Sequence, residues 1–226
     1  MATKKAAQKS AKKAQGGTKA QAGKKGASKP AGNKASQKKT RSKAATQSQQ
    51  QEPMPPFPAQ HQEKPGIESK LRPRPEYQAP LYRGAGKLQD KVALITGGDS
   101  GIGRAVAVLY AREGADVAII YLPQEQSDAE ETERAVETEG RRALLIAGDV
   151  TDAQFCRDAV KQTVKEFGQL DVLVNNAAFQ QHQQSLEEVT EEQWDQTFKT
   201  NIYGYFYMAQ AALPHLKRGS SIVNTG

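Results

Sequence analysis

The sequence has very little cysteine, since Cys156 is its one cysteine in 226 residues. This excludes a disulfide within the chain and is typical of proteins from a reducing compartment. Long hydrophobic runs are also missing. None approaches the roughly 18 residues that a membrane span needs, and the N-terminus lacks the apolar segment of a secretory signal. We therefore expect a cytoplasmic protein that does not span a membrane.

Histidine is equally scarce. His61, His182 and His215 are scattered along the chain and show no metal-ligand spacing, so the sequence predicts no metal site. Cys156 has no partner for redox or metal chemistry, and we expect it to be a small buried hydrophobic residue of a helix.

Residues 1–50 lack Asp, Glu, Val, Leu, Ile and every aromatic residue, but hold 13 Lys and Arg41. They carry +14, so residues 51–226 carry +7 − 14 = −7. A segment that cannot bury apolar surface is predicted to be a disordered basic tail. It could tether DNA or another polyanion without sequence specificity, or it could keep the protein in solution. A third alternative is a mitochondrial transit peptide, although the basic residues of such peptides are usually Arg and here are nearly all Lys.

Residues 51–90 hold eight of the eleven prolines, all between Pro53 and Pro80. Such a segment favours an extended arm over helices. Its apolar side chains can dock on the chain's own domain or on a neighbouring subunit, and the sequence leaves both open. These side chains are Leu71, Tyr77, Leu81 and Tyr82.

Residues 91–226 begin with KVALITGGDSGIG, a short apolar run followed by a glycine-spaced turn at Gly97–Gly103. The run is typical of a parallel strand buried on both faces. A helix over 102–113 is predicted next, with Ile102, Val106 and Leu109 on one face. A strand, a glycine turn and a helix form a cradle for dinucleotide phosphates, because glycines admit the pyrophosphate and helix N–H groups attract its charge.

Strands and helices alternate from there on, which predicts a doubly wound parallel α/β sheet of the Rossmann type. Further strands are expected over 116–122, 142–147, 171–175 and 220–225. Three helix starts are predicted from capping-box spacings; they are Ser127 with Glu130, Thr151 with Gln154, and Thr190 with Gln193, and Gly140 and Gly168 are expected to end the first two helices.

A long helical stretch is expected over about 191–218. It has two apolar faces, so we expect it to pack on the sheet and on a partner. One face holds Phe198, Ile202, Tyr205, Ala209 and Leu213; the other holds Tyr203, Tyr207 and Ala211.

Polar residues follow the predicted strands at the sheet edge where a dinucleotide lies. Asp149 can accept a hydrogen bond from an adenine amino group. Asn175 and Asn176 end the fourth strand, and Asn201 lies in the long helix, where it can bend the helix or hold a water. The fifth strand leads to an edge where a catalytic hydroxyl could lie.

Together these segments resemble the short-chain dehydrogenase/reductase family. The matching pieces are TGGDSGIG at 96–103, GDV at 148–150, NNAA at 175–178, TN at 200–201 and SIVN at 221–224. The proline-rich lead before them is similar to the bacterial general-stress or glucose/ribitol dehydrogenase subgroup. Ala178 departs from the glycine usual at the end of NNAG.

The resemblance implies roles for individual residues. Asn201 would be the catalytic asparagine that holds a proton-relay water. Dimers or tetramers would form on the long helix, and the substrate would be a small carbonyl or alcohol compound. The implied cofactor-binding residues are Thr96, Gly97, Ser100, Gly101, Ile102, Gly103, Asp149, Val150, Asn175, Asn176 and Ala177.

The family's catalytic Ser and Tyr-x-x-x-Lys pair, which follow the fifth strand, are not found in the sequence. We therefore expect the chain to be the N-terminal part of a dehydrogenase, incomplete at its C-terminus and inactive as given. Two other functions stay open: a DNA- or polyanion-associated protein that acts through its basic tail, and a nucleotide-binding regulator without catalysis.

The sequence slightly favours NADP(H) over NAD(H). An NAD site usually places a carboxylate on the ribose about 20 residues after the last glycine. Here Tyr121–Gln124 has none, and Glu125 is the first. Arg104 is a candidate partner for a 2′-phosphate, whereas Asp99 adds negative charge to the loop.

Overall fold

The computed structural model describes residues 53–226. The predictions for residues 1–50, a disordered tail and its contacts with polyanions, lie outside these described residues. Within residues 53–226 no helix is long and apolar enough to cross a membrane.

The centre of the fold is a parallel sheet with the strand order β3-β2-β1-β4-β5. Its strands have the short apolar sequences expected of a sheet covered on both faces, and β1 and β2 are buried along their whole length. Their bounds are β1 Val92–Thr96, β2 Asp116–Tyr121, β3 Ala143–Ala147, β4 Val172–Asn175 and β5 Ser221–Asn224. The predicted doubly wound fold is confirmed, and every predicted strand end lies within one residue of the observed one.

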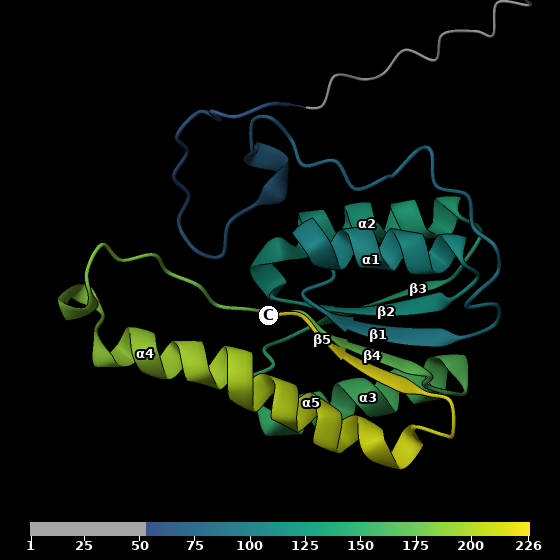
Figure 1. The fold of residues 1–226 in the computed structure, drawn as a ribbon. Coiled ribbons are helices and arrows are strands. Elements are labelled where there is room, and N and C mark those ends of the chain that lie inside the picture. Colours follow the sequence, from purple (N-terminus) through teal and green to yellow (C-terminus); the bar gives the residue numbers. More distant parts are fainter. Residues whose placement is uncertain (1–52) are drawn as a thin grey trace, which may run out of the picture. The chain divides into compact units, whose positions relative to one another are not determined.

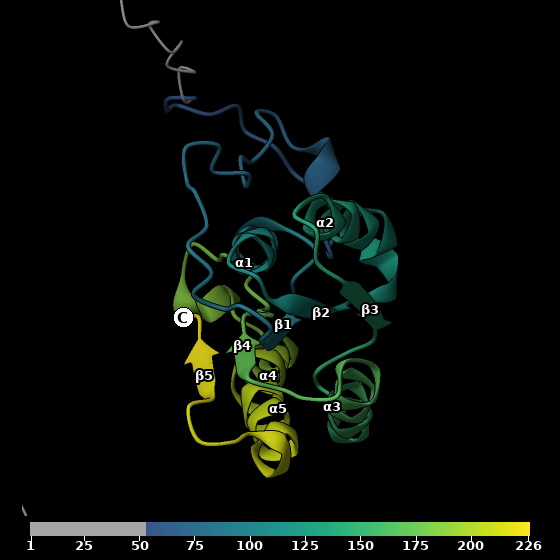
Figure 2. The same ribbon diagram turned by 90° about the vertical axis from the view of Figure 1, so that its right-hand side faces the viewer.

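Helices cover both faces of the sheet (Figures 1 and 2). On one face lie α1 (Gly101–Arg112) and α2 (Gln126–Thr138); on the other lie α3 (Ala153–Phe167), α4 (Glu191–Phe198) and α5 (Tyr205–Ala212). Alternate strand residues serve the two layers because successive side chains of a strand point to opposite faces. Thus Ala93 and Ile95 pack in the layer of α1 and α2, whereas Leu94 packs toward α3 and α5.

Helix α1 buries a different face from the predicted one. Ile102 is 64% exposed, and Val106 and Leu109 are only half-buried. The buried stripe is Gly103, Arg104, Ala107, Val108 and Ala111. The expected face counted apolar side chains, whereas the buried stripe consists of small residues with Val108 and of Arg104, which is buried because it pairs with Glu68.

The three helices start within two residues of the predicted positions, but the predicted capping residue was wrong for two of them. Helix α3 begins after Asp152, whose carboxylate accepts hydrogen bonds from the backbone N–H groups of Gln154 and Phe155 at 2.7 and 3.2 Å; Thr151 lies one residue too early to cap it. Helix α2 begins at Gln126, directly after the 3-10 turn η2 (Pro123–Glu125), so that Ser127 is inside the helix. The cap of α4 is confirmed, since the Thr190 hydroxyl accepts from the Gln193 N–H at 3.2 Å.

The long helical stretch is interrupted. A π-helical segment, Lys199–Gly204 (η4), separates α4 from α5, and the stretch ends in the 3-10 turn η5 (Leu213–His215). Its buried residues are Thr200, Gly204, Met208 and Ala212. On the predicted face, Phe198, Ile202 and Leu213 are exposed by between 37% and 62%, whereas Ala209 packs against the core cluster of α3 and α5.

Residues 53–90, the proline-rich arm, contact the same chain. Their one short helix is the 3-10 turn η1 (Glu68–Lys70). The guanidinium of Arg104 on α1 donates to the Glu68 carboxylate at 2.5 Å, and the Glu68 N–H donates to the Asp128 carboxylate on α2 at 2.7 Å. Glu68 and Arg104 are both buried. Because removing one partner of a buried ion pair typically costs about 3–5 kcal/mol, these contacts fix the arm to the layer of α1 and α2.

Candidate functional site

A cavity of about 610 Å³ opens at the carboxyl ends of the strands. The chain runs outward from β1 to β3 on one side and returns to β4 on the other, so the strand order reverses between β1 and β4. In open α/β sheets this crevice is where ligands bind. Its size is within the usual range for small-molecule sites.

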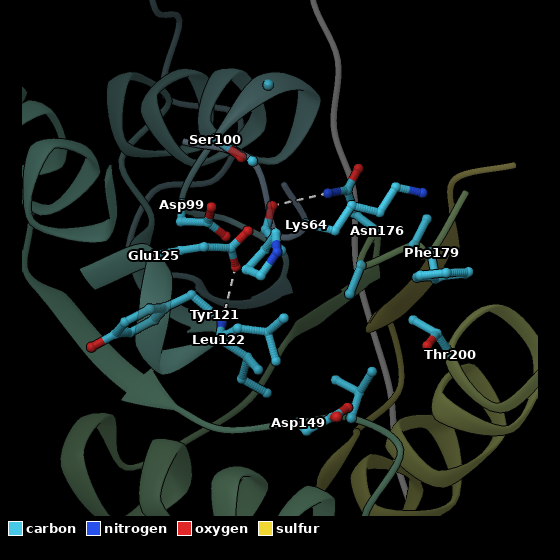
Figure 3. A pocket seen from close by; sticks show the side chains of 18 of the residues that line it. Lys64, Asp99, Ser100, Tyr121, Leu122, Glu125, Asp149, Asn176, Phe179 and Thr200 are labelled. Atoms are coloured by element: carbon cyan, nitrogen blue, oxygen red, sulfur yellow. Dashed lines mark hydrogen bonds between the residues drawn. The ribbon is translucent and has the colours of Figure 1, made fainter. Parts of the chain in front are cut away.

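Eight of the eleven predicted cofactor-binding residues line this cavity (Figure 3). They are Gly97, Ser100, Gly101, Ile102, Asp149, Val150, Asn176 and Ala177. The other three do not line the cavity and instead support its walls from within the fold; they are Thr96, Gly103 and Asn175.

The glycine turn is closed by a backbone contact. A Cβ atom on Gly103 would lie 1.9 Å from the carbonyl oxygen of Gly97, so only glycine lets the first turn of α1 approach β1 this closely. Gly97 itself has φ of +62°, a conformation that glycine adopts without strain. At Gly101 a Cβ would meet no atom within 4 Å. The turn is therefore tightly packed at Gly103. At Gly101 it leaves space on the Cβ side for a phosphate group, although the Gly101 N–H is bonded to the Glu68 carboxylate.

Thr96 and Asn176 join the turn to the end of β4. The Thr96 hydroxyl oxygen accepts hydrogen bonds from the N–H groups of Asn176 and Ala177, both at 2.9 Å. The Asn176 side chain donates to the Gly97 carbonyl at 3.0 Å. Asn175 is buried inside the sheet and donates to the Asn224 side chain of β5 at 2.9 Å. Thr96 and Asn175 thus hold the cavity walls in place.

Asp149 lies at the rim, beyond the end of β3. It is exposed, and its carboxylate accepts from the Thr151 N–H at 2.8 Å. The neighbouring Val150 is buried and contributes an apolar wall. An apolar contact beside a carboxylate acceptor suits a planar ring that carries an amino group.

The end of the cavity near β2 is acidic. Asp99 and Glu125 both line it and lie near each other in Figure 3. Burial, with the nearby charge of Asp99 as the second cause, raises the pKa of Glu125 to about 7, although its carboxylate accepts from the Leu122 N–H at 3.2 Å. Burial also raises the pKa of Asp99. Glu125 therefore changes its charge near neutral pH.

Arg104 is not available to a ligand, which corrects its prediction as a phosphate partner. It is fully buried, and its guanidinium donates to the Asp99 carbonyl at 2.7 and 2.9 Å as well as to Glu68. The side chain points behind the glycine turn, because the buried arm carboxylate lies there. No local pattern indicates this partner, which is 36 residues away in the chain.

Asn201 lies in the π-helical segment next to the cavity. Its side chain forms two hydrogen bonds with the backbone of Phe179: the oxygen accepts from the N–H at 2.7 Å and the amide donates to the carbonyl at 3.0 Å. Its neighbour Thr200 lines the cavity. In this structure Asn201 fixes the loop after β4, and Phe179 and Gln180 of that loop form part of the cavity wall.

The arm supplies three lining residues that the sequence did not identify: Lys64, Pro65 and Gly66. The apolar side chains of the arm indicated docking, but Lys64 lies seven residues before the first of them. Only the fold brings it to the cavity.

A sequence profile described as "short chain dehydrogenase" matches residues 91–226. General stress protein 39 of Bacillus subtilis is 57% identical over 170 residues, which are 75% of this chain and 59% of that protein. Glucose and ribitol dehydrogenase of Daucus carota is 45% identical over 175 residues, 75% of this chain and 60% of that protein. The chain thus spans about three fifths of the length of these relatives.

Solved structures are similar over the same region. A short chain dehydrogenase from Burkholderia cenocepacia in complex with NADP is 41% identical, with a TM-score of 0.59 over 62% of this chain and 56% of that one. Carveol dehydrogenase from Mycobacterium avium in complex with NAD is 32% identical, with a TM-score of 0.59 over 63% of this chain and 56% of that one.

Proposed function

The chain belongs to the short-chain dehydrogenase family, and we propose that its cavity binds a nicotinamide dinucleotide for oxidation or reduction of a small alcohol or carbonyl compound. The observation that carries this proposal is the glycine turn, which is tightly packed behind at Gly103 and open at Gly101 toward a 610 Å³ cavity. When bound, the nicotinamide accepts or supplies a hydride.

The residues of this chain bind the cofactor and hold it in position. Ser100 and Ile102 present the start of α1 to the phosphates, and the Gly101 N–H between them is bonded to the Glu68 carboxylate. Asp149 and Val150 hold the adenine. Asn176 and Ala177 shape the opposite wall. We propose that Asn201, as the family resemblance implies, holds a water for proton relay in addition to fixing the loop at Phe179.

The whole protein's reaction would need the family's Ser and Tyr-x-x-x-Lys set, which the printed sequence does not hold after β5. We therefore expect the 226-residue chain to bind cofactor without turnover. The rival function of a nucleotide-binding regulator predicts the same binding, and is separated from a dehydrogenase by an activity screen of the protein encoded by the whole gene.

Cofactor preference in our proposal depends on pH. The slight preference for NADP(H) rested on a β2 tip without a carboxylate and on Arg104. Glu125 lines the cavity, however, and Arg104 is buried. We infer that NADP(H) is accepted while Glu125 is protonated and that NAD(H) is favoured once Glu125 is ionised, since a carboxylate repels the 2′-phosphate.

We propose homodimers or homotetramers built on the exposed face of α4 and α5, where Trp194, Ile202 and Phe206 are each more than half exposed. Residues 1–50, with a charge of +14, are proposed to add weak contact with nucleic acid. A steep loss of duplex affinity with salt, absent after deletion of residues 1–50, tests that contact. A cytoplasmic location stays a prediction from the single cysteine.

Binding of NADH and NADPH, followed by calorimetry, tests the cofactor site. Ser100→Glu places a carboxylate at the phosphate cradle and is expected to weaken both dinucleotides at least about tenfold, the effect of repulsion that replaces a charge-assisted hydrogen bond. Ser100→Ala is the matched control, with a loss of only a few fold. Undiminished binding by Ser100→Glu, at an unchanged melting temperature, would contradict the proposed site.

A further inference from the structure

Lys64 is the one basic side chain among those that line the cavity within residues 53–226. The acidic lining residues are Asp99, Glu125 and Asp149. A dinucleotide brings a negatively charged pyrophosphate to this acidic surrounding. Helix N–H groups supply only partial positive charge. Among the lining residues within 53–226, the one full cation therefore lies on the arm.

Lys64 is placed across the cavity from the glycine turn. Its ammonium donates a hydrogen bond to the Gln180 carbonyl and lies 4.5 Å from the centroid of the Phe179 ring. Figure 3 shows it near Asn176 and Phe179, on the wall that follows β4. Its neighbours Pro65 and Gly66 line the same cavity as Gly101 and Ile102. The arm therefore passes between the start of α1 and the loop after β4.

The arm is held in this position by Glu68. One carboxylate oxygen of Glu68 accepts from the Gly101 N–H at 2.5 Å, and the other accepts from Arg104 at 2.5 Å. The glycine turn and the arm are thus joined directly. The Gln62 side chain then closes the intervening loop, since its oxygen accepts from the Ile67 N–H at 2.9 Å and its amide donates to the Ile67 carbonyl at 3.1 Å.

Glu68 also changes the electrostatics of the cradle. Its carboxylate takes up the Gly101 N–H, so this donor at the start of α1 is not free for a phosphate, while Arg104 offsets the charge of Glu68. Lys64 can supply the missing donor. It is exposed, and none of the ion pairs formed within residues 53–226 includes it.

We propose that Lys64 is a phosphate-binding residue of the cofactor site, carried over the pyrophosphate by residues 62–68, and that Glu68 is a positioning residue for it. The inference rests on the proposed function. Binding would exchange the neutral Gln180 carbonyl for a phosphate oxygen as the partner of the ammonium. This bond is charge-assisted at both ends and therefore stronger.

Calorimetric titration of the 226-residue chain with NADH tests this role at several salt concentrations. Lys64→Met keeps most of the side-chain length and loses the charge; we expect NADH to bind on the order of tenfold more weakly, the effect of one charge-assisted hydrogen bond to phosphate, and with a weaker dependence on salt. Lys64→Arg keeps the charge and should bind nearly as the unchanged protein does. Lys70→Met is the matched control, because Lys70 lies on the same arm, is exposed and does not line the cavity.

The outcomes separate the two proposals. If the unchanged protein binds neither NADH nor NADPH, the proposed function fails. If it binds and Lys64→Met binds equally well, or if Lys70→Met loses as much, the role of Lys64 is overturned. Glu68→Gln tests the positioning: combined with Lys64→Met, it should weaken binding no further than Lys64→Met alone, whereas losses that multiply would show that the two residues act independently.

Discussion

The carboxylate of Glu125 is the residue through which pH should act on the site. Its pKa of about 7 lies above the ordinary value, chiefly because burial disfavours the charged form. The folded protein therefore binds this proton more tightly than the unfolded chain does. The contribution of Glu125 to stability is fully present below about pH 4.5 and is lost as pH rises through about 7.

The same titration should change cofactor choice. Between pH 6 and 8 the affinity for NADPH relative to NADH should fall by about fivefold, the effect of one added charge about 4 Å from the 2′-phosphate in water. Parallel titrations with both cofactors measure the ratio. Glu125→Gln should remove most of this dependence, and the titration of the 2′-phosphate itself is common to both proteins. Exposed Glu137 on α2 provides the control substitution Glu137→Gln. A ratio that stays constant in the unchanged protein would disprove this role of Glu125.

Single residues also show which parts of the site could be predicted from the sequence. The spacing of Gly97 and Gly103 predicted the cradle, because a tight strand–turn–helix contact requires glycine at these positions. Thr96 and Asn175 were placed at the cofactor, whereas their hydrogen bonds are made within the fold. Arg104 was assigned to a ligand because its buried partner, Glu68, is remote in the chain. Long-range contacts of this kind leave no local pattern to read.

At the scale of the elements, the attachment of the arm to α1 depends on one carboxylate. Glu113, at the end of α1, accepts hydrogen bonds from the Tyr82 hydroxyl and from the backbone N–H groups of Ala85 and Lys87. The Tyr82 bond, followed by that of Lys87, lowers the pKa of Glu113 to about 2. Since the folded pKa is below the ordinary value, this stabilisation is present above about pH 4.5 and is lost as pH falls through about 2.

We expect residues 82–87 to detach in acid and to become accessible to pepsin, which is active there. Glu113→Gln should expose the segment even at neutral pH, and its melting temperature should depend less on pH between 4.5 and 2 than that of the unchanged protein. Other carboxylates with lowered pKa, such as Asp116 and Glu131, titrate in both proteins and cancel in the comparison. Equal pH profiles for the two proteins would exclude Glu113 as the anchor.

Elements were predicted better than their ends. The strands follow from apolar runs, and the α4 cap from a Thr hydroxyl at the right spacing. Helix α3 is capped by Asp152 instead of Thr151, one residue away, because Thr and Asp are both good capping residues and the spacing alone does not distinguish two neighbours. A bend at Asn201 was among the expectations for the long helix, whereas the π-helical form of the segment was not predicted. The Asn201 side chain bonds to the remote Phe179 backbone, a contact without a local sequence signal.

For the whole molecule, two exposed apolar surfaces should govern association. Strand β5 forms one edge of the sheet, and Ile222 and Val223 are 37% and 41% exposed. The second surface is the face of α4 and α5 with Phe206. An uncovered strand edge is a template for pairing with another chain, and large apolar patches mark interfaces.

We therefore expect the 226-residue chain to associate and to be poorly soluble. Light scattering after gel filtration compares the unchanged protein with Val223→Lys, which opposes edge pairing, and with Phe206→Lys, which places a charge on the helical face. Val223→Lys should reduce open-ended aggregation, and Phe206→Lys should reduce a defined dimer or tetramer. A monodisperse monomer with a cooperative melt in the unchanged protein would refute the expectation.

The contacts of Glu68 also set an order of events in folding. Its partners follow 36 and 60 residues later in the chain, on α1 and α2. The ribosome therefore releases the arm well before Arg104 and Asp128 exist, and closing so long a loop has an entropic cost that local helices avoid. We expect the arm to dock after the helical layer has formed. The segment made first would then be among the last to be placed, and Lys64 would reach the cavity only in molecules whose helical layer is already complete.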